Sequence, residues 1–142
     1  MKPSWDEYFM QMCEVVSSRS IDPSTRHGCV ISDKNHRIIS TGYNSPIQGI
    51  DDSQIPLTRP EKYPYFLHSE ENAILFAQRS IEGAIVYITG MPCSRCLRQL
   101  LQLKVAKIVY GNRNSHCIDN TDLQATQHMI KMTNIIMTNY IT

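Results

Sequence analysis

Two short segments of the sequence carry residue types that could bind a metal ion and move protons. Cys93 and Cys96 stand three positions apart after Pro92, and His68 stands two positions before Glu70. Zinc prefers thiolate and imidazole ligands, and three protein ligands leave a fourth position for water, whose pKa falls toward ~7. A carboxylate beside such a site can accept and return the proton of that water. The two segments therefore predict a hydrolytic zinc centre, with His68, Cys93 and Cys96 as ligands and Glu70 as the catalytic acid and base.

Other interpretations of these residues stay open at this point. A Cys-x-x-Cys pair also occurs in redox centres, in structural zinc sites and as packed thiols. A structural zinc site needs a fourth protein ligand, but none of Cys13, Cys29 and Cys117 forms a second pair of this kind. Glu70 could also be a solvated glutamate that stabilises the first turn of a helix, a description that suits Glu71 better. The lack of a second cysteine pair favours the catalytic arrangement.

Two helix starts are predicted to present the metal ligands. Residues 68–79 have apolar residues at helical spacing, which places His68 at the beginning of a helix. Pro92 suits the first helical position, and a helix over residues 92–103 would hold both cysteines on its first turn. The helix dipole and free backbone N–H groups there favour the thiolates that zinc requires. We expect two parallel strand-and-helix units to bring both helix starts to one edge of a sheet.

The remaining pattern is that of one α/β domain over residues 1–142. Residues 45–67 hold four prolines and are predicted to form a long irregular loop, a kind of segment that is usually functional. The first helix has Ser4 as its cap and an apolar stripe made of Trp5, Tyr8, Phe9, Met12, Val15 and Val16. Helices are expected at residues 4–18, 68–79, 92–103 and 119–131, and strands at 29–32, 37–44, 84–88, 105–111 and 133–137.

Composition narrows the classes of function. The chain has 14 Lys plus Arg against 13 Asp plus Glu, so it lacks the basic surplus of a protein that binds nucleic-acid polymers by counterion release. No apolar run approaches the ~20 residues of a membrane span, and we expect no membrane partner. Five cysteines, an odd number, without an apolar leader segment favour a reducing compartment, and we expect a cytoplasmic protein.

Several residues outside the two segments could contact a substrate. Arg26 could be a solvated loop arginine or a phosphate contact, and Asn44 could cap a turn or bond a sugar. Tyr63, Tyr65 and Phe66 could pack the loop against the core or form the wall of a pocket for a flat base. The histidines without paired cysteines nearby are expected to be surface or hydrogen-bonded residues, namely His27, His36, His116 and His128.

With these residues assembled, the sequence resembles the zinc-dependent cytidine deaminase superfamily, whose signature is His-x-Glu followed by Pro-Cys-x-x-Cys. Residues 68–70 and 92–96 match its two halves. From about residue 18 to about residue 111 the chain is most similar to deoxycytidylate deaminases, which convert dCMP to dUMP and ammonia and so feed dTMP synthesis. The resemblance implies a three-layer α/β/α fold around a central mixed five-stranded sheet. The compact length would suit a phage or viral member, which would work in the host cytoplasm.

The resemblance also implies roles for individual residues. His68, Cys93 and Cys96 would bind zinc, and water activated there would attack C4 of cytosine. Glu70 would protonate N3 and then pass a proton to the departing amine. Contacts to the substrate would come from Arg26, Asn44, Tyr65 and Ser69.

Feedback control is a further property of these deaminases, with dCTP as activator and dTTP as inhibitor at a second nucleotide site, usually with Mg²⁺. The enzymes are homo-oligomers, often hexamers. Two residues depart from the usual pattern, since Ser45 replaces a common glycine and Glu71 introduces a charge where an apolar contact is common. The positions of this chain that match the effector site are Tyr43, Asn44, Gly49, Phe76 and Arg79.

Three rival functions share part of the pattern. A deaminase of tRNA adenosine or of single strands has the same zinc motif, but the near-neutral charge and the Tyr-Pro-Tyr loop at residues 63–65 disfavour a polymer. A deaminase of another cytosine nucleoside or nucleotide would differ in its phosphate contact. A non-enzymatic, zinc-stabilised binding module would need no acid–base residue at Glu70.

Overall fold

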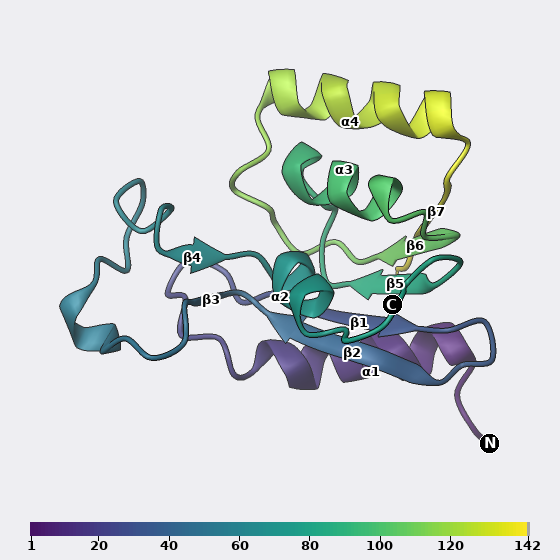
Figure 1. Cartoon of the computed structure of the whole chain (residues 1–142), viewed down its shortest axis with the longest axis horizontal. Helices are drawn as coiled ribbons and strands as arrows, with labels where there is room; N and C mark the ends of the chain where they lie inside the picture. The colour runs from purple at the N-terminus through teal and green to yellow at the C-terminus, as the bar shows by residue number, and fades with distance from the viewer. Residues whose placement is uncertain (142) are drawn as a thin grey trace.

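A mixed five-stranded sheet forms the centre of the computed structural model, which describes residues 1–141 (Figure 1). The strand order is β2-β1-β5-β6-β7, with β1 antiparallel to β2 and β5, and with β5, β6 and β7 parallel. This arrangement confirms the mixed sheet that the resemblance implied. The strands are β1 (Gly28–Ser32), β2 (Ile38–Tyr43), β5 (Ile85–Ile88), β6 (Lys107–Tyr110) and β7 (Ile136–Asn139).

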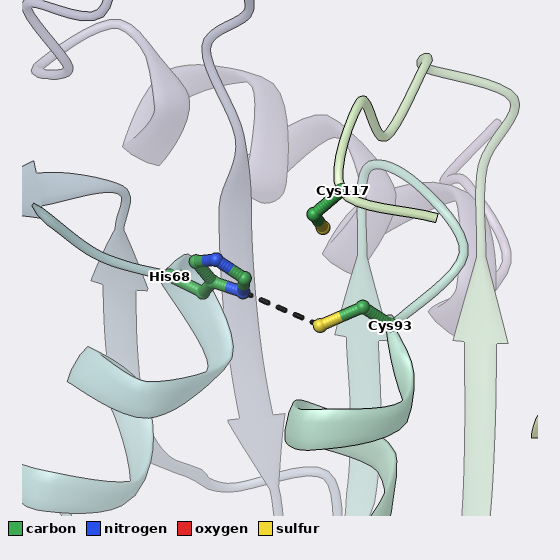
Figure 2. A group of neighbouring side chains, drawn as sticks. All are labelled: His68, Cys93 and Cys117. Atoms are coloured by element: carbon green, nitrogen blue, oxygen red, sulfur yellow. Dashed lines mark hydrogen bonds between the residues drawn. The ribbon is translucent and has the colours of Figure 1, made fainter. Parts of the chain in front are cut away.

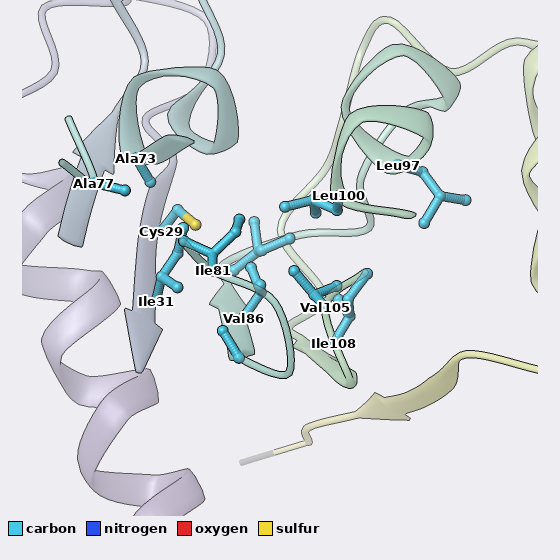
Figure 3. Packing of buried hydrophobic residues seen from close by; sticks show 12 residues of the cluster. Cys29, Ile31, Ala73, Ala77, Ile81, Val86, Leu97, Leu100, Val105 and Ile108 are labelled. Carbon is cyan, nitrogen blue, oxygen red and sulfur yellow. The ribbon is translucent and has the colours of Figure 1, made fainter. Parts of the chain in front are cut away.

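Helices cover both faces of this sheet because its strands alternate between two apolar clusters. On β1, Cys29 and Ile31 join a cluster with residues of the second and third helices (Figure 3), against which the fourth helix packs. Val30 instead joins a cluster with Phe9 of the first helix. The fold therefore has the three α/β/α layers that were expected. The helices are α1 (Trp5–Ser17), α2 (Ser69–Leu75), α3 (Ser94–Gln102) and α4 (Asn120–Thr133).

Helix α1 packs on a face that overlaps only partly with its predicted apolar stripe, since Phe9, Met12 and Val16 pack inward. Ser4 caps it as expected, accepting a 3.1 Å hydrogen bond from the Glu7 N–H. A Cβ atom on Gly28 would lie 2.1 Å from the carbonyl oxygen of Cys13, so the missing side chain lets α1 approach β1 through its Cys13 face. The buried residues are Phe9, Met10, Cys13 and Ser17, while Trp5, Tyr8 and Val15 of the predicted stripe are exposed.

The segment over residues 45–67 is more ordered than the irregular loop that was predicted. Its ends pair antiparallel as β3 (Ser45–Pro46) and β4 (Phe66–Leu67), and a short 3₁₀ helix spans Asp52–Gln54. The pairing brings the two ends of the segment side by side, directly before His68. The loop therefore closes next to the predicted metal ligands.

Several boundaries also differ from the prediction. Helix α2 ends at Leu75 rather than residue 79, and Gln78 then takes a φ of 55° that no helix accommodates. Helix α3 begins at Ser94, so Pro92 lies outside it and Cys93 is its N-cap. Helix α4 continues to Thr133, because its left-handed C-cap is Asn134, and β7 follows later than expected. Within residues 1–141 no helix has the length and apolar character to cross a membrane.

The expected pair of parallel strand-and-helix units is only half present. Helix α3 lies between the parallel strands β5 and β6, as predicted. Helix α2 instead follows β4, which belongs to the separate two-stranded sheet. The two helix starts nevertheless meet, through the geometry of the small sheet rather than through a second parallel crossover.

Candidate active site

The three predicted metal ligands converge at the starts of α2 and α3. His68 and Cys93 are the N-cap residues of these helices, and Cys96 lies on the first turn of α3. The Nδ1 atom of His68 lies 3.2 Å from Cys96 Sγ. It also lies 3.5 Å from Cys93 Sγ, the contact drawn in Figure 2. Tetrahedral zinc with ordinary bond lengths would hold such nitrogen and sulfur atoms about 3.6 Å apart. Donor types and spacing therefore fit a zinc ion at this point.

The protonation states of His68, Cys93 and Cys96 depend on one another. Interactions with the thiols of Cys117 and Cys96, and with His68, lower the pKa of the Cys93 thiol far below its ordinary value. Burial opposes protonation of His68, but the Cys93 sulfur outweighs it and raises the pKa of the imidazole. The interaction with Cys93, together with burial, raises the pKa of Cys96. A zinc ion would displace the protons that these groups share.

Glu70 lies beside the ligands with its carboxyl group in a buried setting. The residue is 6% exposed, and the Ser69 hydroxyl donates a 2.7 Å hydrogen bond to its Oε1 atom. Burial raises the pKa of Glu70, so the carboxyl group holds a proton to higher pH than a solvated glutamate does. A carboxyl group in this position can serve as a general acid and base.

A cavity of about 520 Å³ opens onto these residues. This volume is typical of small-molecule sites and is large enough for a nucleotide. The cavity is lined from four parts of the chain, which are residues 22–27 with Asn44, 59–70, 88–95 and 115–122. Among the predicted site residues, those that line it are Asn44, His68, Ser69, Glu70 and Cys93.

One wall of the cavity is fixed by a buried ion pair. Lys62 Nζ lies 2.7 Å and 2.8 Å from the two carboxylate oxygens of Asp22, and these residues are 4% and 7% exposed. The Asn44 amide donates to Asp22 and to the Thr25 carbonyl, and its oxygen accepts from the His27 N–H at 2.8 Å. Asn44 therefore shapes the wall through bonds to the protein. The sequence had singled out neither Asp22 nor Lys62.

Two of the predicted substrate contacts lie away from the cavity lining. Arg26 is exposed, and Tyr65 is 42% exposed, whereas its neighbour Tyr63 lines the cavity. His27 bonds Thr89 and the Asn114 carbonyl through its two ring nitrogens, as expected for a hydrogen-bonded histidine, and it also lines the cavity. Burial lowers the pKa of His27 to about 4, which keeps the ring neutral.

Of the residues predicted for an effector site, Tyr43, Asn44 and Gly49 come before α2 in the chain, and Phe76 and Arg79 come after it. The Tyr43 carbonyl accepts a 2.7 Å hydrogen bond from Asn72 of α2. Phe76 is 52% exposed just after α2, and the exposed Arg79 lies 3.9 Å from Asp33. Gly49 stands in an open turn with a φ of 87°. Tyr43 thus contacts α2, and Phe76 and Arg79 follow it, whereas Asn44 lies in the cavity wall and Gly49 in the loop.

Glu71 has a role that the prediction of a solvated glutamate missed. Its side chain is only 15% exposed, and Oε1 accepts hydrogen bonds from the His68 N–H at 3.0 Å and from Arg95 at 2.8 Å. Gln99 of α3 adds a third bond at 3.4 Å. The carboxylate thus joins the helix that begins at His68 to the helix that carries both cysteines.

Two further residues near the ligands were not assigned from sequence. Asp122 of α4 accepts hydrogen bonds from the backbone N–H and the hydroxyl of Ser94, which caps the start of α3. The Cys117 sulfur lies within 4.8 Å of both a His68 ring nitrogen and Cys93 Sγ (Figure 2). Neither has a signal in the local sequence, since Asp122 is 28 positions from Ser94 and Cys117 stands alone.

The sequence profile described as the cytidine and deoxycytidylate deaminase zinc-binding region matches residues 3–112. The chain belongs to this family. It is 36% identical to an uncharacterized deaminase in the luxG 3′ region of Aliivibrio fischeri, over 97% of this chain and 95% of that protein. It is 28% identical to the deoxycytidylate deaminase of Pongo abelii, over 96% of this chain and 80% of the relative. The predicted family and the deaminase class of enzyme are therefore confirmed.

A solved structure supports the same assignment of the fold. The dCMP deaminase of the cyanophage S-TIM5, crystallised in complex with dCMP and dUMP, superposes with a TM-score of 0.80. The two proteins are 26% identical, and the match covers 99% of each chain. The cytidine-deaminase-like fold that the resemblance implied is confirmed by this likeness.

Proposed function

We propose that this chain catalyses the hydrolytic deamination of dCMP to dUMP and ammonia, with a zinc ion held by His68, Cys93 and Cys96. One observation carries the proposal, namely that a single His68 nitrogen lies within 3.5 Å of both cysteine sulfurs at the edge of a cavity that buried Glu70 lines. The similarity to deoxycytidylate deaminases supports dCMP as the substrate, and so does the likeness to the cyanophage enzyme crystallised with dCMP and dUMP.

Glu70 moves the protons of the proposed reaction. Zinc, when bound, supplies Lewis acidity and lowers the pKa of a water at the open position. Glu70 takes a proton from the attacking water and delivers it to N3 of cytosine. It then passes a proton to the 4-amino group, which leaves as ammonia. One carboxylate can serve both transfers because N3 and the amino nitrogen are bonded to the same carbon atom.

The substrate phosphate needs a cation that is not already paired. Lys62 is paired with Asp22, and Arg95 is paired with Glu71. Arg59 also lines the cavity, and within residues 1–141 it takes part in no ion pair. We therefore add Arg59 to the proposed substrate contacts Arg26, Asn44, Tyr65 and Ser69.

Kinetics on two substrates separates the proposed phosphate contacts. Replacing a phosphate ligand should raise KM for dCMP at least tenfold and leave deoxycytidine kinetics unchanged. We expect this result for Arg59→Gln. The same assay on Arg26→Gln tests whether the exposed Arg26 also contacts the phosphate. Equal losses on both substrates would argue against a phosphate role for the residue changed.

We further propose regulation and assembly of the kind known in the family. The effector nucleotides would be dCTP as activator and dTTP as inhibitor, with Mg²⁺, at a site that includes Tyr43, Asn44, Gly49, Phe76 and Arg79. A homo-hexamer would cover the exposed apolar residues Leu75 and Phe76, which are 65% and 52% exposed. The five cysteines are free within residues 1–141, which supports work in a reducing cytoplasm, the host's for a phage protein. Light scattering and assays with each effector test these proposals.

A substrate panel tests the proposed function against its rivals. Zinc-loaded protein is assayed for ammonia with dCMP, dCTP, deoxycytidine, cytidine and a tRNA anticodon stem. We expect the highest kcat/KM for dCMP. Preferred turnover of deoxycytidine or of the tRNA stem would replace dCMP by that substrate class, and turnover of none would leave only a zinc-stabilised binding module.

A further inference from the structure

A third cysteine, Cys117, lies beside two of the proposed zinc ligands. A ring nitrogen of His68, Cys93 Sγ and Cys117 Sγ all lie within 4.8 Å of one another. Figure 2 shows the Cys117 sulfur directed toward the space between the other two side chains. These ligand atoms come from the start of α2, the start of α3 and the segment between β6 and α4. The arrangement is therefore a cluster of converging donors rather than an isolated thiol.

Hydrogen bonds hold the segment that carries Cys117 against the strand end and the loop that precede Cys93, and against His27. The Arg113 N–H bonds the Thr89 carbonyl at 3.0 Å, and the Ser115 hydroxyl bonds the Met91 carbonyl at 3.0 Å. His27 also donates a 3.0 Å hydrogen bond to the Asn114 carbonyl. These bonds tie the segment to the residues just before Cys93 and set where Cys117 can reach.

We propose that Cys117 is a fourth, displaceable zinc ligand that closes the metal site until substrate enters. The inference rests on the proposed zinc set of His68, Cys93 and Cys96. One imidazole and three thiolates form a common tetrahedral zinc environment, whose edges measure about 3.5–3.8 Å. The ligand atoms of His68, Cys93 and Cys117 lie at most 4.8 Å apart, within about 1 Å of that geometry. Cys96 Sγ lies 3.2 Å from His68 Nδ1, and side-chain adjustment would bring it together with Cys117 around one ion.

Burial distinguishes Cys117 from the other two cysteine ligands. Cys93 and Cys96 are 5% and 0% exposed, whereas Cys117 is exposed. Cys117 can therefore leave the metal without disturbing packed side chains. Glu71 also has an oxygen within 4.8 Å of His68 and Cys96 ligand atoms, but three donors already engage its carboxylate.

Displacement of Cys117 has a simple chemical balance. The zinc–sulfur bond breaks, and water takes the vacated position. The departing thiolate takes up one proton from that water and becomes a neutral thiol. Oxidation states do not change, so no further reactant is needed. A substrate that displaces the Cys117 side chain would thus expose the metal only when the cavity is filled.

Cobalt substitution tests the ligand count independently of turnover. Co²⁺ bound to thiolates absorbs in the near ultraviolet in proportion to the number of sulfur ligands, and we compare the wild type with Cys117→Ser and Cys117→Ala. We expect either variant to lose about one-third of the band, because one thiolate of three is lost. The matched control is Cys13→Ser, whose hydroxyl can still donate to the Tyr87 carbonyl as the Cys13 thiol does. Unchanged bands in correctly folded Cys117 variants would overturn the inference.

Adding dCMP to the cobalt protein tests displacement. The wild-type band should fall to the level of the Cys117→Ser variant, whose own band should not change. A wild-type band that stays constant at saturating dCMP would overturn the displaceable role. Absence of any sulfur–cobalt band would instead refute the zinc set. A three-thiolate band without deamination would refute the proposed function alone.

Discussion

Glu71 and Arg95 connect the two helices that hold the candidate zinc ligands, with 2.8 Å between Glu71 Oε1 and the Arg95 guanidinium. The same oxygen accepts the His68 N–H at 3.0 Å. Burial alone would raise the pKa of Glu71, but these bonds outweigh it and lower the pKa, which keeps the carboxylate charged. The contact therefore sets the distance between His68 and the cysteine-bearing helix before a metal binds.

Removing this carboxylate should weaken zinc binding. Glu71→Ala leaves the His68 N–H and Arg95 without their acceptor, and we expect zinc affinity to fall about 10–100-fold. Glu71→Gln keeps an acceptor oxygen and should lose less. Competition with a chromogenic chelator measures both affinities. Arg98→Gln, an exposed change on α3, serves as the control. Wild-type affinity in Glu71→Ala would show that the connection has no part in forming the site.

The Asp22–Lys62 pair should contribute strongly to stability, because neither charge can reach water. Lys62→Met leaves a buried carboxylate unpaired, and we expect the free energy of unfolding to fall by about 3–5 kcal/mol. The double variant Asp22→Asn with Lys62→Met should regain much of this loss, since it removes the unpaired charge. Urea unfolding followed by circular dichroism measures both. A Lys62→Met variant as stable as the wild type would contradict the buried pairing.

His27 should make stability depend on pH in acid. Burial lowers its pKa from 6.5 to about 4, so the folded protein prefers the neutral ring. The stability that His27 contributes is fully present above pH ~6.5 and is lost as pH falls toward 4. The loss of unfolding free energy is about 2 kcal/mol near pH 4.5. Urea unfolding at pH 7.5, 5.5 and 4.5 gives the slope, which should be smaller in His27→Gln. Identical slopes would exclude His27 as the source.

The residues proposed to do the chemistry were found from local pattern, and the structure brings them together. His68 and Glu70 are two positions apart and the cysteines three, so ligand type and spacing are visible in a few letters. The residues that position them are not local. Lys62 meets Asp22 across 40 positions, and Arg95 meets Glu71 across 24. Only the folded chain shows such pairs.

Backbone contacts explain the errors in the predicted elements. Helix α1 has apolar residues on more than one face, and the close approach at Gly28 selects the Cys13 face. The end of α4 depends on Asn134, which tolerates a left-handed conformation in which most residues are strained. The short pairing of β3 with β4 involves two residues on each strand, too few for a periodic signal.

The most direct test of the account is the conversion of dCMP by zinc-loaded wild type and Glu70→Gln, with zinc content measured on both. In the proposed reaction Glu70 would provide the proton transfers but no metal bond. We therefore expect dUMP and ammonia in equal amounts from the wild type. The variant should keep a full zinc content while kcat falls by about two to four orders of magnitude. A zinc-loaded wild type that releases no ammonia from dCMP, or a Glu70→Gln variant with undiminished kcat, would contradict it.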